Sequence, residues 1–158
     1  MITALGIDPG VAITGFAVVS CDAGKYTLKE YGVIRTLERT PLPERLHLLY
    51  RDMNSVLERY ESVDVAGVEE LFFAKNVTTA FMVGQARGVI LLALEGRGVR
   101  IREFKPVEVK SLIVGNGQAK KADVQRMVQL TFGLQKPPQP DDAADAVAIA
   151  MAACSAIN

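Results

Sequence analysis

Four acidic residues that lie far apart in the chain have surroundings in which a carboxylate could take part in chemistry. Asp8 stands between an apolar, strand-like stretch and a Pro-Gly pair typical of a turn. Glu69 ends a second apolar run, and Asp142 and Asp145 are three residues apart at the start of an apolar helix, where they would share one face. If the two strands are neighbours, the four carboxylates could form one acidic site at the edge of a sheet.

The donor set of such a site contains only oxygen, because no His or Cys is placed to join it. Carboxylate oxygens suit Mg²⁺ or Mn²⁺ better than zinc. Four carboxylates also repel one another unless cations lie between them. Two ions about 4 Å apart can activate a water and stabilise a leaving oxygen, which is the chemistry of phosphodiester cleavage.

A purely structural interpretation stays open for two of these residues. Asp8 could serve only to shape its turn, and Asp142 could be one of the acidic residues that favour the first turn of a helix. Asp145 is harder to explain in this way, because it lies deeper in an apolar helix and a buried carboxylate needs a partner or a metal.

The elements that must position these residues are predicted from periodicity and turn signals. Residues 2–8, 15–19 and 26–36 are expected to form an antiparallel meander, with a bulge near Glu30 where the alternation changes phase. Two further strands and five helices follow, and the first and fourth strands are expected to be parallel neighbours. The expected fold is α/β, with a mixed five-stranded sheet flanked by helices. The further strands are residues 63–69 and 99–104. The first helix is expected to start at Thr40-Pro41 and to run about five turns, with its apolar positions over residues 46–60, and the other helices are residues 76–94, 106–114, 119–132 and 143–157.

The predicted helix over residues 76–94, with Asn76 as its N-cap, is apolar around most of its circumference. Such a helix must be covered on two sides. One side can pack on the sheet, and Gly84 and Gly88 permit close approach on the other. The second cover is either another copy of the chain or the C-terminal helix.

Length and composition indicate one soluble domain over residues 1–158. Cys21 and Cys154 are expected to be free thiols. No signal peptide is evident and the uncharged runs are too short for a bilayer, so a cytoplasmic protein without membrane contact is expected. Residues 97–136 hold nine basic residues against three acidic ones. This excess of positive charge could form a surface that binds a polyanion. The alternative is that these residues are only the solvated faces of ordinary helices.

Several ordered motifs are similar to the RuvC-type crossover (Holliday) junction endonucleases, within the ribonuclease H-like superfamily. The similarity covers essentially the whole chain and gives the expected sheet a ribonuclease H-like topology. Its motifs are GIDPG at 6–10, TG at 14–15, VEELFFAKN at 68–76, GQARG at 84–88, VKSLIVGNGQAKK at 109–121 and DDAADAVAIA at 141–150.

The resemblance implies a homodimer that nicks two opposing strands of a four-way DNA junction, with a branch-migration helicase complex as an expected partner. It places the four carboxylates in the catalytic, metal-binding role, with two Mg²⁺ per site and Mn²⁺ as a substitute. Some relatives have His in place of Asp142, so the chemistry of that position is the most open, and many have Gln in place of Glu70.

The resemblance also implies the residues that contact DNA. Lys110 and Lys121 would bind DNA near the site, and Phe72 would meet bases at the junction centre, beside Lys75. Lys120 replaces an acidic residue of some relatives and adds positive charge. From the residues alone, Phe72 could equally belong to the hydrophobic core, and the lysines could be ordinary solvent-exposed residues of helices.

Other functions compete with this interpretation. The opening stretch alone also resembles actin-like and sugar-kinase ATPases, but those need two such domains and the chain is too short for both. A junction-binding module without catalysis would avoid the acidic set, because carboxylates repel phosphate. A ribonuclease H-like nuclease that cleaves RNA stays possible.

Overall fold

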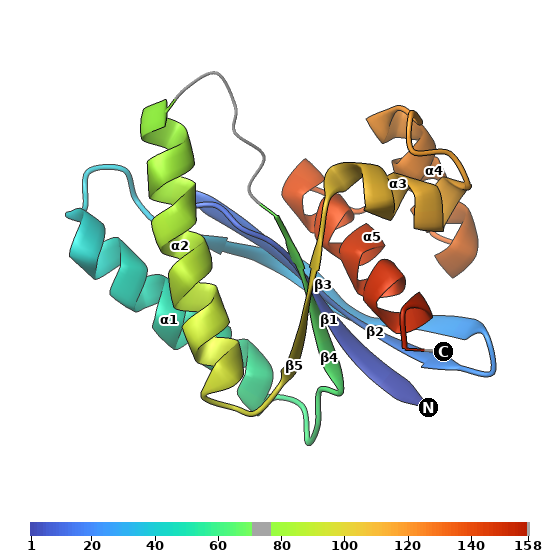
Figure 1. Cartoon of the computed structure of the whole chain (residues 1–158), viewed down its shortest axis with the longest axis horizontal. Helices are drawn as coiled ribbons and strands as arrows, with labels where there is room; N and C mark the ends of the chain where they lie inside the picture. The colour runs from blue at the N-terminus through green and yellow to red at the C-terminus, as the bar shows by residue number, and fades with distance from the viewer. Residues whose placement is uncertain (71–76, 158) are drawn as a thin grey trace.

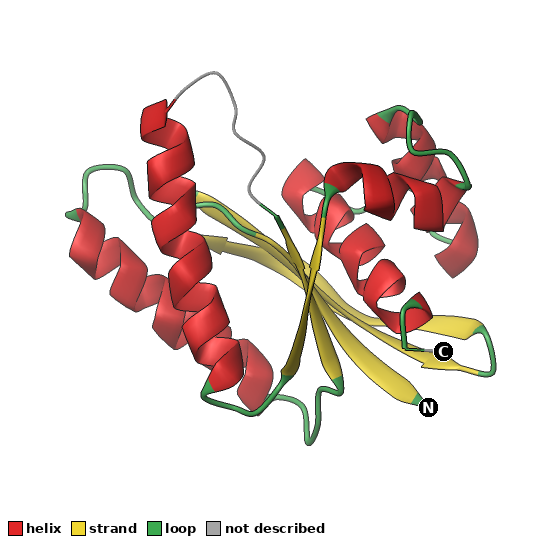
Figure 2. Ribbon diagram, viewed as in Figure 1, coloured by secondary structure: helices red, strands yellow, loops and turns green. Residues whose placement is uncertain are grey.

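The computed structural model describes residues 1–70 and 77–157, which form one twisted five-stranded sheet with helices on both faces (Figure 1; Figure 2). The strands lie in the order β3-β2-β1-β4-β5. The strands are β1 (Ile2–Asp8), β2 (Ile13–Asp22), β3 (Lys25–Arg35), β4 (Val65–Glu69) and β5 (Arg100–Phe104), and the helices are α1 (Leu42–Glu58), α2 (Val77–Glu95), α3 (Pro106–Val114), α4 (Lys121–Phe132) and α5 (Asp141–Ser155).

The pairing of the strands confirms the predicted mixed sheet. β1, β2 and β3 form an antiparallel meander, whereas β4 is parallel to both β1 and β5. Between Val18 and Val19 of β2 the register with β3 shifts, which leaves Lys29 as the extra residue of a bulge. The predicted bulge near Glu30 is therefore confirmed, and β2 is longer than the expected strand over residues 15–19.

The two faces of the sheet differ in side-chain size, and this difference follows from alternation along the strands. On β1, the small Ala4 and Gly6 face α5, whereas the larger Leu5 and Ile7 face α1 and α2. β2 repeats the pattern near the same edge, with Gly15 and Ala17 on the α5 face and Phe16 and Val18 on the other. One face can therefore accept a helix at close range.

α5 uses this space to lie directly on the sheet. A Cβ built on Gly6 would overlap the backbone of Ala146 and Ala150, and one built on Gly15 would overlap the carbonyl oxygen of Asp142. Nearly every residue from Ala143 to Cys154 is buried as a result. The absence of a side chain at the two glycines therefore fixes how close the start of α5 lies to the end of β1.

α2 packs beside α1 on the opposite face from α5 (Figure 1). The suggestion that the C-terminal helix covers the second side of α2 is therefore wrong, because the sheet lies between the two helices. Phe81 and Leu92 remain exposed on that side at 68% and 63%. Asn76, the predicted N-cap, lies outside the described residues.

By length and composition, α2 is the one helix of the described residues that is long and apolar enough to cross a membrane. The same test is met by core helices of soluble proteins. Ala86, Ile90, Ala93 and Leu94 of α2 are buried in the core shared with α1, which accounts for one side of its apolar surface.

Candidate active site

Asp8 and Glu69 end two neighbouring parallel strands, and alternation sets the direction of their side chains. β1 and β4 are in register up to the pair Ile7 and Val68, so the next residue of each strand lies at the same edge of the sheet. Asp8 has the parity of Gly6, which faces α5. Glu69 has the parity of Gly67, whose Cβ would meet Ile149 of α5. Both carboxylates therefore lie on the α5 face of the sheet.

α5 brings two further carboxylates to the same edge. Its first turn contains Asp142, whose carbonyl oxygen packs against Gly15, the partner of Asp8 in the β1–β2 ladder. Asp145 follows one turn later on a helix that is otherwise buried. The glycine contact thus holds both acidic residues of α5 near the end of β1.

The carboxylates are close enough to change one another's ionisation. The pKa of Asp8 rises from 3.8 to about 8, first because the carboxyl is buried and then because Glu69, Asp145 and Asp142 are negatively charged nearby. Burial and Asp145 also raise the pKa of Glu69, while a side-chain hydrogen bond with Asp8 and the charge of Lys121 oppose that rise. Ionising both Asp8 and Glu69 is therefore unfavourable, and the pair favours a bound proton or a bound cation.

Lys121 of α4 partly offsets this charge. Its Nζ donates a hydrogen bond of 2.7 Å to Asp145 Oδ2 and lies 3.4 Å from Asp141 Oδ2. Burial raises the pKa of Asp145 more than this hydrogen bond lowers it. Burial lowers the pKa of Lys121, but its bonds and charge contacts with the two aspartates raise it overall. Lys121 therefore stays protonated beside the acidic centre.

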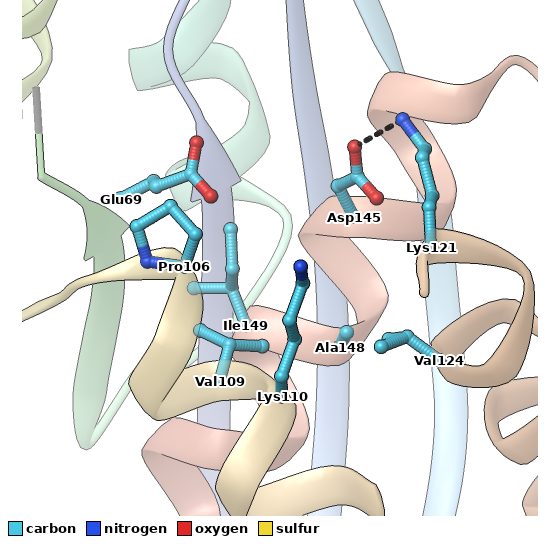
Figure 3. Close-up of a pocket in the computed structure, with 9 residues that line it drawn as sticks. All are labelled: Glu69, Pro106, Val109, Lys110, Lys121, Val124, Asp145, Ala148 and Ile149. Carbon is cyan, nitrogen blue, oxygen red and sulfur yellow. Dashed lines mark hydrogen bonds and ion pairs between the residues drawn. The ribbon is translucent and has the colours of Figure 1, made fainter. Parts of the chain in front are cut away.

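The acidic centre opens into a pocket of about 200 Å³ between the end of β4, α3, α4 and α5 (Figure 3). Lys110 rises from α3 into the space between Glu69 and Asp145, and Lys121 approaches from α4 (Figure 3). The apolar floor consists of Val109, Val124, Ala148 and Ile149, with Pro106 at the side. Two lysines thus flank the carboxylates, as a site that holds a phosphate beside a cation requires.

The donor set fits a hard divalent cation. Among the described residues, no group of three or more acidic, His or Cys side chains already has the spacing to hold a metal ion. The partly buried carboxylates of Asp8, Glu69 and Asp145 nevertheless all have raised pKa values, first because burial disfavours their charged forms and then because neighbouring carboxylates repel them. A divalent cation bound by their oxygens would relieve that repulsion.

The other residues predicted to take part differ in how the structure places them. Lys110 and Lys121 line the pocket, whereas Lys120 precedes α4 and its backbone N–H donates to Asp123 Oδ2 at 2.8 Å. α4 begins at Lys121 rather than at Ala119 because of this cap. Phe72 and Lys75 lie outside the described residues.

Sequence reasoning missed a buried polar cluster beside the turn that follows Asp8. Thr14, Thr36 and Arg45 are three of the four buried polar or charged residues in the described part of the chain. Thr14 Oγ1 donates to Gly10 O at 2.6 Å, and Thr36 Oγ1 donates to Val11 O at 2.5 Å. Sequence patterns do not show whether a threonine next to a turn, or an arginine on an amphipathic helix, is buried. Only tertiary packing reveals that these residues hold the turn.

Comparison with known sequences identifies the family. The sequence model of the family described as "Crossover junction endodeoxyribonuclease RuvC" matches residues 4–153. A protein with that name from Chloroflexus aggregans is 52% identical over 148 residues, which cover 94% of this chain and 90% of the relative. Another from Brevibacillus brevis is 49% identical over 147 residues, covering 93% and 88%.

Solved structures agree with the sequences. Thermus thermophilus RuvC in complex with a Holliday junction substrate superposes with a TM-score of 0.91 at 35% identity, over 96% of this chain and 92% of that one. The yeast mitochondrial resolvase Ydc2 shares the fold, with a TM-score of 0.67 at 16% identity over 94% and 77%. The chain therefore belongs to the RuvC family of crossover junction endodeoxyribonucleases.

Proposed function

We propose that this chain resolves four-way (Holliday) DNA junctions by paired, symmetric nicks, in homologous recombination and DNA repair. One observation carries the proposal: four carboxylates gather at the end of β1 and β4 under α5, with Lys110 and Lys121 beside them. The relatives named above are crossover junction endonucleases, and one was solved with its junction. A DNA substrate also suits the expected cytoplasmic location.

The family consists of metal-dependent nucleases, and we assign Mg²⁺ to this site, two ions per centre, with Mn²⁺ able to substitute. Asp8, Glu69, Asp142 and Asp145 would hold the ions. When bound, such ions lower the pKa of an attacking water and stabilise the departing 3′ oxygen. Asp8 and Glu69 would share the ions, because both end neighbouring strands on the α5 face of the sheet.

The lysines have a separate task in this mechanism. The hydrogen bond to Asp145 fixes the ammonium group of Lys121, which would attract the scissile phosphate while the carboxylates hold the ions. Lys110, which rises between Glu69 and Asp145, provides a second cation on the α3 side (Figure 3). The family resemblance adds Phe72 to the DNA surface, and the positive charges of Lys75 and Lys120 would extend it.

A twofold dimer would supply two equal sites to a junction that has its own near-twofold symmetry. We assign the second cover of α2 to another copy of this chain. Val77, Phe81, Gly88 and Leu92 recur along one exposed stripe of α2, and a Cβ at Gly88 would meet nothing within 4 Å. Such a stripe is apolar and exposed, which suits a symmetric helix–helix contact. A branch-migration helicase complex is the further partner that the resemblance implies.

The test is a nicking assay on a synthetic four-way junction with Mg²⁺, with every strand labelled and the cuts mapped. We expect paired cuts in two opposing strands, leaving 5′ phosphates that a ligase can seal. Asp8→Asn should keep junction binding and abolish cleavage, and the exposed Glu61→Gln should behave as wild type. Cleavage by Asp8→Asn at a near wild-type rate would contradict the assignment of the carboxylates.

Substrate controls separate this function from its nearest rival. A linear duplex with the same sequence should be cut far less than the junction, and an RNA–DNA hybrid should not be cut. Preferential cleavage of the hybrid would instead indicate a ribonuclease.

A further inference from the structure

A second pocket, of about 480 Å³, adjoins the acidic centre on the side away from Lys110 and Lys121. Its walls are the turn that follows Asp8, the start of α1, the first half of α2 and the beginning of α5. Asp142 borders it and also contributes to the electrostatics of Asp8, so the two pockets meet at the carboxylates. Its lining residues include Gly10, Glu38, Arg45, Thr79 and Met82.

Arg45 is the unusual residue of this pocket. It is only 6% exposed, yet it has no ion pair among the described residues. Its hydrogen bond among the described residues runs from Nε to Thr36 Oγ1 at 2.8 Å, and no ion pair there involves its terminal nitrogens. A buried cation without a counter-charge is costly unless an anion compensates it.

The surroundings of Arg45 hold it in one orientation. Thr36 Oγ1 accepts from Nε and donates to Val11 O, which ties the arginine to the turn after Asp8. Thr36 N also donates to Ala12 O at 3.0 Å. An arginine fixed through Nε presents its two terminal nitrogens as a preformed fork, the geometry that binds a phosphate group.

Two further features bear on the charge of the pocket. The first turn of α2 borders it at Thr79, and the positive end of a helix macrodipole favours an anion. Glu38 and Asp142 oppose an anion, but Glu38 is exposed and Asp142 belongs equally to the proposed metal centre. The exposed stripe of α2 with Phe81 and Leu92 lies on another side of the helix, so a dimer partner there would leave the pocket accessible.

We propose that Arg45 and this pocket bind a backbone phosphate of the junction strand, adjacent to the scissile phosphate and on the side opposite Lys110 and Lys121. This inference rests on the proposed function, since it assigns a second contact to the same substrate. The strand would then cross the carboxylates with a fixed cation on each side. The pocket would set which phosphodiester reaches the acidic centre.

The test compares R45Q, R45K and T36V with R51Q, which removes an exposed arginine of the same helix. Junction binding is measured in EDTA as a function of salt, after circular dichroism has shown that each variant is folded. We expect R45Q to bind about tenfold more weakly, with a log–log salt slope shallower by about 0.9. R45K should recover part of the affinity, and R51Q should match wild type.

A scan with single methylphosphonates, which are uncharged, separates phosphate binding from a structural role. Wild type should lose about tenfold in affinity at one position, the phosphate adjacent to the cut, and R45Q should lose nothing further at that position. If R45Q does not fold, T36V is scanned instead. The methylphosphonate at that position should then reduce the affinity of T36V less than it reduces the affinity of wild type. A folded R45Q with wild-type affinity and slope, or losses that simply add at every position, would overturn the proposal. If wild type neither binds nor cuts the junction, the proposed function itself fails, which is a separate result.

Discussion

The raised pKa of Asp8 makes the stability of the metal-free protein depend on pH in an unusual direction. An aspartate has an unfolded pKa near 3.8, and here the folded value is about 8. Between pH 4 and pH 8 the native state therefore holds a proton that the unfolded state has lost, so stability falls as pH rises through this range. Above pH 8 both states are ionised and the loss is complete.

The size of this effect follows from the shift. About three of the four pKa units lie below pH 7, and each unit corresponds to about 1.4 kcal/mol, so the upper limit at pH 7 is about 4 kcal/mol. Because burial, the largest cause of the shift, also costs the amide of the variant some free energy, we expect Asp8→Asn to recover roughly half. Without metal at pH 7, the variant should be more stable than wild type by about 2 kcal/mol.

The assay is urea unfolding of wild type, Asp8→Asn and the surface control Glu61→Gln in EDTA from pH 4.5 to 8.5. The advantage of Asp8→Asn should grow with pH and disappear near pH 4.5, whereas Glu61→Gln should follow wild type throughout. Adding Mg²⁺ at pH 8 should stabilise wild type more than Asp8→Asn. Parallel curves for wild type and Asp8→Asn across the whole range would refute the reasoning.

Three further substitutions test other parts of the structure. Gly15→Ala forces a methyl group into the backbone at Asp142, so it should destabilise the protein by about 1–3 kcal/mol in thermal unfolding and abolish most junction cleavage. Lys121→Met removes the cation that lowers the pKa of the carboxylates, so the acidic limb of the pH–rate profile should move to higher pH; an unmoved limb would contradict the ion pair with Asp145. Leu92→Arg charges the exposed stripe of α2 and should give a folded monomer by light scattering, unless α2 is not the dimer contact.

The sheet and the convergence of its acidic residues were predictable, because both depend on local patterns. Alternation and turn signals place Asp8 and Glu69 at the ends of strands, and a crossover helix makes those strands parallel neighbours. Spacing alone puts Asp142 and Asp145 on one face of a helix. The side of the sheet on which each helix lies is a different matter. The C-terminal helix was one suggested cover for α2, and nothing local in either helix excludes it.

Features that depend on contacts between distant segments could not be predicted. Gly15 looked like one residue of a short strand, but its role is to admit the backbone of Asp142 from the other end of the chain. Arg45 occupies a helix that is amphipathic in sequence, and its burial depends on Thr36 and the turn beyond Asp8. Lys110 and Lys120 are equally basic in sequence, yet only Lys110 lines the pocket.

The unequal side-chain sizes on the two faces of the sheet also bear on how this protein can change. Beneath the first half of α5 there is no room for a side chain at Gly6 or Gly15, since both already lie against the helix backbone. The layer beneath α1 and α2 contains large aliphatic residues such as Leu5 and Met53, which tolerate exchanges of similar volume. Substitutions that raise thermal stability should therefore be sought on the α1–α2 side, where repacking leaves the spacing between α5 and the acidic centre unchanged.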